Sequence, residues 1–310
     1  MNYMCLTTHF IDKDWTLHKK ILNFCPITSH KCDDMATVII KCLRDWGLDK
    51  VLAVTVDNLD DITVEELSKR FIKWGTNIMD GNHLHMRYMA HIINLIVQEG
   101  LEEVGDSVKR VRQAVRYIKQ SSKRWRKFKA CCLFERITYE NSLCLDVPTR
   151  WDSTYLMLDV AQEFEEAFVR YGALDPGLMH YLVTYVCDDG KPAGSLVSSD
   201  WENVRHMVKI LKPFYELTLK VSGSLYVTSN VHFEEICELD VVLKNLIENE
   251  NVEMSLMAKK MEDKLHKYFG NPEKMKMIFI ASVLDPRNKF EYVAFALVSL
   301  FGEEKGGKNK

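Results

Sequence analysis

Residues 51–61, VLAVTVDNLDD, decide the fold that we expect, because six strand-forming residues run directly into an acidic turn. The first six are mostly β-branched and apolar without polar alternation, which is typical of a strand buried on both faces. Asp57 follows at the carboxyl end of this strand, where the ligands of open α/β sheets collect. The stretch therefore predicts the central strand of an α/β core with a carboxylate able to hold a divalent cation.

A second interpretation of the same turn is purely structural. Two-metal sites need two or three carboxylates from different elements, because Mg²⁺ prefers an octahedral set of oxygen ligands. Asp60 and Asp61 lie in the same turn as Asp57 and cannot easily face one ion from opposite sides. Asp57 and Asn58 would then simply end the strand, and Asp61 would cap the next helix. Spacing alone favours this second interpretation.

Composition sets wide limits on the class of protein. The 310 residues suffice for two or three domains, or for one domain with a large insertion. No apolar run approaches the roughly 20 residues of a membrane span, and the first residues have no signal-peptide pattern. The nine cysteines are irregularly spaced without a C-x-x-C motif, which indicates free thiols in a reducing compartment. We expect a nuclear protein, with the cytoplasm as runner-up, and no membrane partner.

Periodicity and turn signals divide the chain into a mixed part and a helical part. The first part, residues 1–150, holds strands at 3–11 and 15–27, a helix from Asp33 to Trp46, the central strand, and a helix over 63–74. Further helices are predicted at 89–103, 104–120 and 122–136, and a short strand at 142–147. The second part, residues 151–302, is predicted to be helical at 151–171, 200–221, 228–248, 252–269 and 273–283. Residues 303–310 lack apolar side chains and are predicted to be a disordered tail.

A basic run is the strongest charge pattern in the sequence. Residues 107–134 contain ten Lys and Arg and no acid. Helical spacing puts four cations on one stripe, opposite a buried valine and isoleucine side, and aromatic residues interleave with the last four. Such a stripe fits contacts to nucleic-acid phosphates, which are blind to sequence. A solvated helix face is the alternative, although it normally carries both signs of charge. The four cations of the stripe are Arg112, Arg116, Lys119 and Lys123.

Two smaller motifs have both a functional and a structural interpretation. Trp151, with Arg150 before it, would either stack on a base or seal the start of a helix, and its pattern favours core packing. His83, His85 and His91 are candidate zinc ligands, because imidazole is a common ligand of zinc. No cysteine or acid stands at ligand spacing from them, so hydrogen-bonded packing histidines are favoured.

Seven segments together resemble the hAT superfamily of transposases, in particular its RICESLEEPER/DAYSLEEPER-like branch of BED-zinc-finger proteins. They occur in the family's order and span nearly the whole chain. The segments are YMCLTTHFIDKDWTLHKKILNF (3–24), VTVDN (54–58), AHIINLIVQEGL (90–101), LCLDVPTRWDSTYLML (143–158), DWENVRHMVKILKPFY (200–215), TSNVHFEEI (228–236) and VLDPRNKFEYV (283–293).

The resemblance implies a ribonuclease-H-like core interrupted by a large all-helical insertion, hence an α-rich α/β fold. In that family, two aspartates and a glutamate bind the Mg²⁺ ions for DNA strand transfer, and Asp57 matches the second aspartate. The chain begins after the strand that carries the first aspartate and stops before the glutamate, and the BED zinc finger is absent as well. We therefore expect an incomplete core with exposed strand edges or an unfilled slot. His91 and Asn58 match further family positions, and Arg150-Trp151 matches a motif that lies close to the cut DNA.

The resemblance and the basic run together predict a degenerate or domesticated hAT transposase-like protein that binds DNA without sequence preference. One acid of three cannot organise two metal ions, so we expect no strand transfer, a vestigial Asp57, and no cofactor. The alternatives are a protein-interaction scaffold that pairs with hAT-like relatives as a homo- or hetero-oligomer, and a fragment of an active transposase from a truncated gene model. The predicted DNA contacts are Arg112, Arg116, Lys119, Lys123, Arg124, Arg126, Lys127, Arg150 and Trp151.

Overall fold

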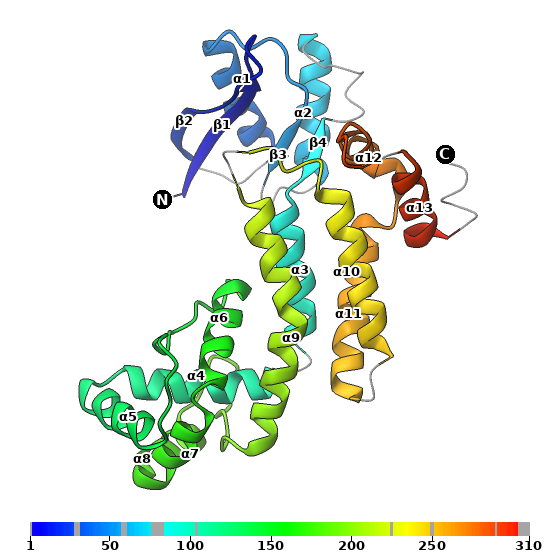
Figure 1. Cartoon of the computed structure of the whole chain (residues 1–310). Coiled ribbons are helices and arrows are strands. Elements are labelled where there is room, and N and C mark those ends of the chain that lie inside the picture. The colour runs from blue at the N-terminus through cyan, green and yellow to red at the C-terminus, as the bar shows by residue number, and fades with distance from the viewer. Residues whose placement is uncertain are drawn as a thin grey trace. The chain divides into compact units, whose positions relative to one another are not determined.

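The computed structural model describes residues 2–27, 32–56, 61–75, 84–102, 105–223, 226–248, 251–288 and 290–302. The fold is mostly helical, with one β-hairpin and a second pair of short strands (Figure 1). No helix in these ranges is long and apolar enough to cross a membrane. The chain divides into two compact units. The first comprises Met1–Ile92, Lys220–Phe233 and Lys274–Val293, and the second comprises Ile93–Leu219, Glu234–Glu273 and Ala294–Lys310.

The first unit begins with a long antiparallel hairpin of β1 (Asn2–Ile11) and β2 (Leu17–Ile27), which confirms the hairpin predicted from the sequence. Asp12 builds its turn, because one carboxylate oxygen accepts hydrogen bonds from two backbone N–H groups of the turn, each at 2.9 Å. The other oxygen lies 2.6 Å from Nε2 of His18. These hydrogen bonds, the one from His18 first, hold the pKa of Asp12 below its usual range.

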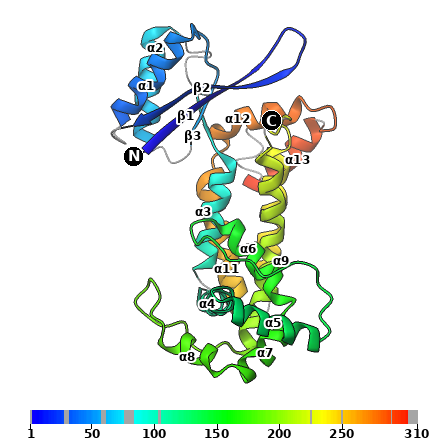
Figure 2. The ribbon, with the colours of Figure 1, turned by 90° about the vertical axis from the view of Figure 1, so that its left-hand side faces the viewer.

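Two helices supply the core of this unit. α1 (Cys32–Asp45) and α2 (Asp61–Trp74) bury one apolar face each, and Figure 2 shows them side by side. Each helix is followed by a glycine with positive φ, which favours a residue without a Cβ at that position. Partly buried apolar side chains of β1, β2 and β3 pack against the helical cluster, which also includes Leu84 just before β4. One hydrophobic cluster therefore supports the hairpin and β3.

The four strands form two separate sheets. β3 (Val54–Val56) pairs in parallel with β4 (His85–Arg87), whereas the hairpin pairs only with itself in the described part of the chain. The central strand is thus three residues long rather than the six predicted. Within the described residues, each of these sheets has two strands.

Helices make up most of the remaining described residues. From α3 onward they are α3 (Met89–Leu101), α4 (Gly105–Lys119), α5 (Ser122–Phe134), α6 (Trp151–Gln162), α7 (Glu165–Leu174), α8 (Pro176–Thr184), α9 (Ser198–Val221), α10 (His232–Ile247), α11 (Val252–Phe269), the short 3-10 helix η2 (Pro272–Met275), α12 (Lys276–Val283) and α13 (Phe290–Phe301). Within the second unit, α4, α5, α7 and α8 lie together in both views (Figures 1 and 2).

Aromatic side chains join α5 to α7. Phe128 of α5 is fully buried, and its ring centroid lies 4.9 Å from that of Phe168 and 5.9 Å from that of Tyr171. Phe164, at the junction of α6 and α7, lies 6.1 Å away. These tilted and edge-on pairs are the arrangements that aromatic rings prefer. One face of α5 is therefore fixed in the core, and its other face remains for solvent.

Several predicted elements were wrong in detail. Residues 142–147 form no strand, and the single helix predicted over 151–171 breaks at Phe164 into α6 and α7. α8 and α13 were not predicted, although Asp175 and Pro176 supply an N-cap and a proline in the first turn of α8. The predicted tail at 303–310 lies outside the described residues.

Candidate nucleic-acid interface

Most of the predicted metal-binding turn lies outside the described residues. β3 ends at Val56, and Asp57, Asn58 and Asp60 lie outside the described residues, as does His83. His91 lies in the first turn of α3 and is half-buried. The roles given to Asp57 as a vestigial metal ligand and to Asn58 and His91 as family-motif residues remain predictions.

The cations of α4 are largely neutralised by acids that lie far away in the sequence. Lys109 Nζ lies 2.6 Å from a carboxylate oxygen of Asp189, and Arg110 lies 2.8 Å from Asp200. The other face of this helix is buried, as its valine and isoleucine spacing predicts. The run of ten cations is therefore acid-free only along the chain, because the fold supplies acids from residues 146–200.

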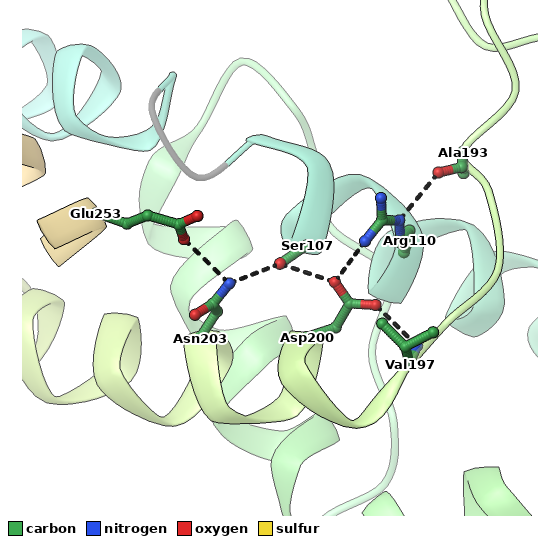
Figure 3. Close-up of polar contacts among 7 residues, drawn as sticks. All are labelled: Ser107, Arg110, Ala193, Val197, Asp200, Asn203 and Glu253. Carbon is green, nitrogen blue, oxygen red and sulfur yellow. Dashed lines mark hydrogen bonds and ion pairs between the residues drawn. The ribbon is translucent and has the colours of Figure 1, made fainter. Parts of the chain in front are cut away.

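Asp200, in the first turn of α9, is the centre of one such network (Figure 3). Its side chain is 1% exposed. One carboxylate oxygen accepts hydrogen bonds from Ser107 Oγ and from the Arg110 guanidinium, both at 2.8 Å. The other oxygen accepts the backbone N–H of Val197 at 2.9 Å. The network thus fixes α4 against the start of α9, which is a structural role.

Arg112, from the predicted stripe, has a similar structural partner. Its Nε donates to Asp146 at 2.7 Å, and the Asp146 side chain is only 2% exposed. Thr154 Oγ1 donates to the same Asp146 oxygen at 2.9 Å. Arg112 therefore balances a buried carboxylate, and removing it would leave that charge without its partner. Since its side chain is 22% exposed, little of it is accessible to a nucleic acid.

The cations of α5 are arranged differently. Four of them are exposed, and no ion pair joins any of them to an acid in the described part of the chain. Helical spacing puts at least three of the four on one side of α5, away from the buried Phe128. We call these four residues the α5 cation face: Lys123, Arg126, Lys127 and Lys129.

Trp125 adjoins the α5 cation face. The ammonium groups of Lys119 and Lys129 lie 4.5 Å and 5.2 Å from the centroid of the Trp125 ring, within the range of cation–π attraction. Arg124 turns inward instead: its guanidinium lies 3.6 Å from the Tyr117 ring and donates to the Tyr117 carbonyl at 3.3 Å. Lys119 and Lys129 thus surround an aromatic ring with positive charge, whereas Arg124 is occupied by packing. Arg116 is half-exposed and forms no ion pair with an acid among the described residues.

Trp151 lies in the core, as its pattern favours. It is 3% exposed at the first residue of α6, so its ring offers no free face to a base. Ser153 stabilises the turn that precedes Trp151. Its hydroxyl accepts a hydrogen bond from the Val147 N–H at 2.8 Å and donates one to the Arg150 carbonyl at 2.7 Å. Arg150 is exposed at the N-cap of α6 and its side chain makes no capping bond.

The cysteines near this surface are free thiols. All eight cysteines whose side chains are described are free thiols, which agrees with the free thiols predicted from their spacing. Burial raises the pKa of the Cys132 thiol to about 11, and it also raises the pKa of neighbouring Cys131. Both thiols are therefore protonated near neutral pH, whereas metal ligation and nucleophilic attack require the thiolate.

Sequence reasoning missed the residues that decide which cations remain accessible. Asp146, Asp189 and Asp200 stand 34, 80 and 90 positions from their partners, and no periodicity links residues at such distances. Lys129 was part of the basic run but not of the predicted contact set. Its exposure next to Trp125 is a signal that only the fold provides.

Three family models match successive parts of the chain. Residues 1–83 match the ZBED1 RNase-like domain, and residues 86–192, which include α4 and α5, match the ZBED1 RNase-like helical domain. Residues 230–309 match the hAT-like transposase model with an RNase-H fold. The expected architecture, RNase-H-like domains together with a helical domain, is confirmed at this level.

Curated relatives align with nearly the whole chain. "Zinc finger BED domain-containing protein RICESLEEPER 2" of Oryza sativa subsp. japonica is 29% identical over 309 residues, which cover 98% of this chain and 41% of the relative. DAYSLEEPER of Arabidopsis thaliana is 27% identical over 99% of this chain and 42% of its own length. "Putative AC transposase" of Zea mays is 28% identical over 97% and 36%. The chain thus spans about two fifths of the length of these relatives. Together with the domain matches, these alignments make the chain a hAT transposase-like protein with ZBED1 RNase-like domains, related to the RICESLEEPER and DAYSLEEPER proteins.

Proposed function

We propose that the α5 cation face binds the phosphate backbone of DNA without sequence preference, and that this chain does not cut the DNA. The observation that carries the proposal is the contrast between neighbouring helices. Cations of α4 are paired with Asp146, Asp189 and Asp200, whereas the four exposed cations of α5 have no such partner within the described residues. Free cations on one helix face are what phosphate contacts require.

Relatedness to transposases supports a nucleic acid as the partner, and Trp125 supplies an aromatic surface beside the cations. Three cations outside the α5 cation face are proposed as further phosphate contacts: Arg116, Lys119 and Arg150. The proposal excludes strand transfer because Asp57 is the one family acid that these 310 residues match, and two metal ions need several converging carboxylates. A DNA partner also supports a nuclear location over the cytoplasmic alternative.

The test is binding of duplex DNA across a salt series. A variant with Lys123→Gln, Arg126→Gln, Lys127→Gln and Lys129→Gln is expected to lose up to four phosphate contacts. The slope of log K against log salt should then fall by roughly 3.6, because each contact contributes about 0.9. Four contacts correspond to a roughly 100-fold loss of affinity of the unaltered chain between 50 and 200 mM salt. Fluorescence anisotropy with a labelled duplex measures both quantities.

A matched control separates a local site from the effect of net charge. Lys19→Gln, Lys20→Gln, Lys209→Gln and Lys212→Gln change four exposed lysines on β2 and α9 and give the same change in net charge. The salt slope of this variant should equal that of the unaltered chain. Equal losses in the two variants would contradict a site on α5. Mg²⁺- or Mn²⁺-dependent nicking that disappears in Asp57→Ala would contradict the non-catalytic part of the proposal.

A second candidate function is self-association through the helical half of the chain or pairing with hAT-like relatives. α13 supports it, because Phe290 and Phe295 are 58% and 72% exposed there. Large apolar side chains exposed on one helix favour association. Light scattering should give a dimer mass for the unaltered chain and a monomer mass for Phe295→Glu. A stable monomer at all concentrations would rule this candidate out.

A further inference from the structure

Helices α10 and α11 bring together three side chains that can ligate a metal ion. Asp240 comes from α10, whereas Glu262 and His266 come from α11, where a spacing of four residues puts them on one face. One ligand atom of each residue lies within 4.8 Å of the other two. The closest pair is His266 Nε2 and Asp240 Oδ1, at 2.8 Å.

Hydrogen bonds between and within the two helices fix the positions of these three side chains. Ser255 near the start of α11 donates a hydrogen bond to the Ile247 carbonyl at the end of α10, at 2.6 Å. Since His266 meets Asp240 further along, the helices run antiparallel and are tied at two levels. Asn251 caps α11 by accepting the Met254 N–H at 3.1 Å. The cluster therefore lies on regular secondary structure, which positions ligands more accurately than a loop does.

Both carboxylates are buried. Asp240 is 2% exposed and Glu262 is 7% exposed. Lys244 Nζ lies 2.6 Å from Asp240 Oδ2, and Lys259 Nζ lies 2.6 Å from Glu262 Oε2. The hydrogen bond to Asp240 raises the pKa of His266 above its usual range. The two lysine ammonium groups thus supply the positive charge that balances the two buried carboxylates.

We propose that Asp240, Glu262 and His266 bind one Zn²⁺ ion, with water as the fourth ligand. One imidazole and two carboxylates form a three-residue ligand set of the kind that leaves a coordination position open. The imidazole favours zinc over Mg²⁺, which prefers oxygen ligands only. On binding, the ion would replace the direct contact between His266 Nε2 and Asp240 Oδ1. This site belongs to the second unit and is independent of the proposed DNA contact on α5.

Two lysines would compete with the ion for the carboxylates. The Lys244 and Lys259 side chains are 45% and 52% exposed, so both can turn into water when zinc arrives. Cys237 stands one turn before Asp240, and burial, with Asp240 adding to it, raises the pKa of its thiol to about 12. The side chains that converge here are Asp240, Glu262 and His266, so the proposed ligand set is one nitrogen and two oxygens.

Titration of the full chain with ZnCl₂ and with Co²⁺ tests this site. We expect one equivalent of zinc per chain, and a cobalt spectrum without a thiolate charge-transfer band. Asp240→Asn and His266→Ala should each weaken zinc binding at least tenfold, because even the loss of outer-shell partners costs about 10–100-fold. As matched controls, Asp188→Asn and His180→Ala remove an exposed carboxylate and an exposed imidazole and should leave binding unchanged.

A variant that strengthens the site keeps the test decisive if the weakened variants unfold. Lys244→Gln with Lys259→Gln removes both competing cations, so zinc should bind it more tightly and raise its melting temperature more than that of the unaltered chain. No zinc binding by this double variant would overturn the proposal and leave an ion-pair network only. A thiolate band, or binding that persists in folded His266→Ala, would also overturn it, because cysteines would then hold the ion.

Discussion

Asp200→Ala is expected to lower the free energy of unfolding by about 3–5 kcal/mol, the usual cost of breaking a buried charged pair from one side. The carboxylate is 1% exposed and accepts Ser107 Oγ and the Arg110 guanidinium, both at 2.8 Å. Its removal leaves the Arg110 charge without its acid and the Val197 N–H without an acceptor. Urea unfolding followed by far-UV circular dichroism measures the change.

Asp189→Ala is the matched control for this prediction. Asp189 pairs with Lys109 at a similar distance, 2.6 Å, but its side chain is 54% exposed. We expect this pair to contribute less than the buried one, because water screens the exposed Asp189 carboxylate, although the Lys109 side chain is only 15% exposed. We expect the urea midpoint to stay nearly unchanged. Equal losses for the two variants would mean that burial of Asp200 does not set the strength of the α4–α9 network.

Trp151→Ala is expected to destabilise the chain by about 3–5 kcal/mol, as large aromatic truncations in cores do. The reason is burial, since the ring is 3% exposed at the start of α6. Trp151→Phe should restore most of this loss, because it refills much of the vacated volume. The measurement is urea unfolding, combined with DNA affinity at one fixed salt concentration.

The two Trp151 variants also distinguish the two interpretations of the Arg150-Trp151 motif, core packing and stacking on a base. If Trp151 packs in the core, Trp151→Phe binds DNA like the unaltered chain. Trp15→Ala is the control for removing a tryptophan, because Trp15 is 87% exposed in the hairpin turn and its loss should cost no stability. Normal stability of Trp151→Ala together with lost DNA affinity would instead mean that the ring stacks on the nucleic acid.

Local signals in the sequence predicted most helices and the hairpin. Gly47 and Gly75 mark the ends of α1 and α2, and apolar spacing identified the buried side of α4. These features depend on neighbours within one or two turns, so periodicity and capping rules reach them. The short β3 is a different case. Its length depends on pairing with β4 some 30 residues away, which strand propensity does not encode.

The candidate site shows the same limit. The sequence identified the cations of α4 and α5 but could not tell which of them are accessible. A sequence shows which residues are charged, whereas the acids that neutralise them are known only from the fold. Arg112 was a predicted DNA contact, and the fold places it beside Asp146. The zinc-ligand trio is similar: Glu262 and His266 have a readable spacing of four, whereas Asp240 joins them only through the packing of α10 on α11.

The β1–β2 hairpin has one more consequence, for how the protein behaves at high concentration. Lys19, Lys20 and Pro26 protect the β2 edge, since charge and a missing N–H discourage a further strand. β1 contains no Lys, Arg, Asp or Glu in its ten residues. β1 therefore has none of the charged residues that discourage its backbone from pairing with a further strand. The hairpin is asymmetric in this respect, and β1 is the edge at which pairing with another molecule is least opposed.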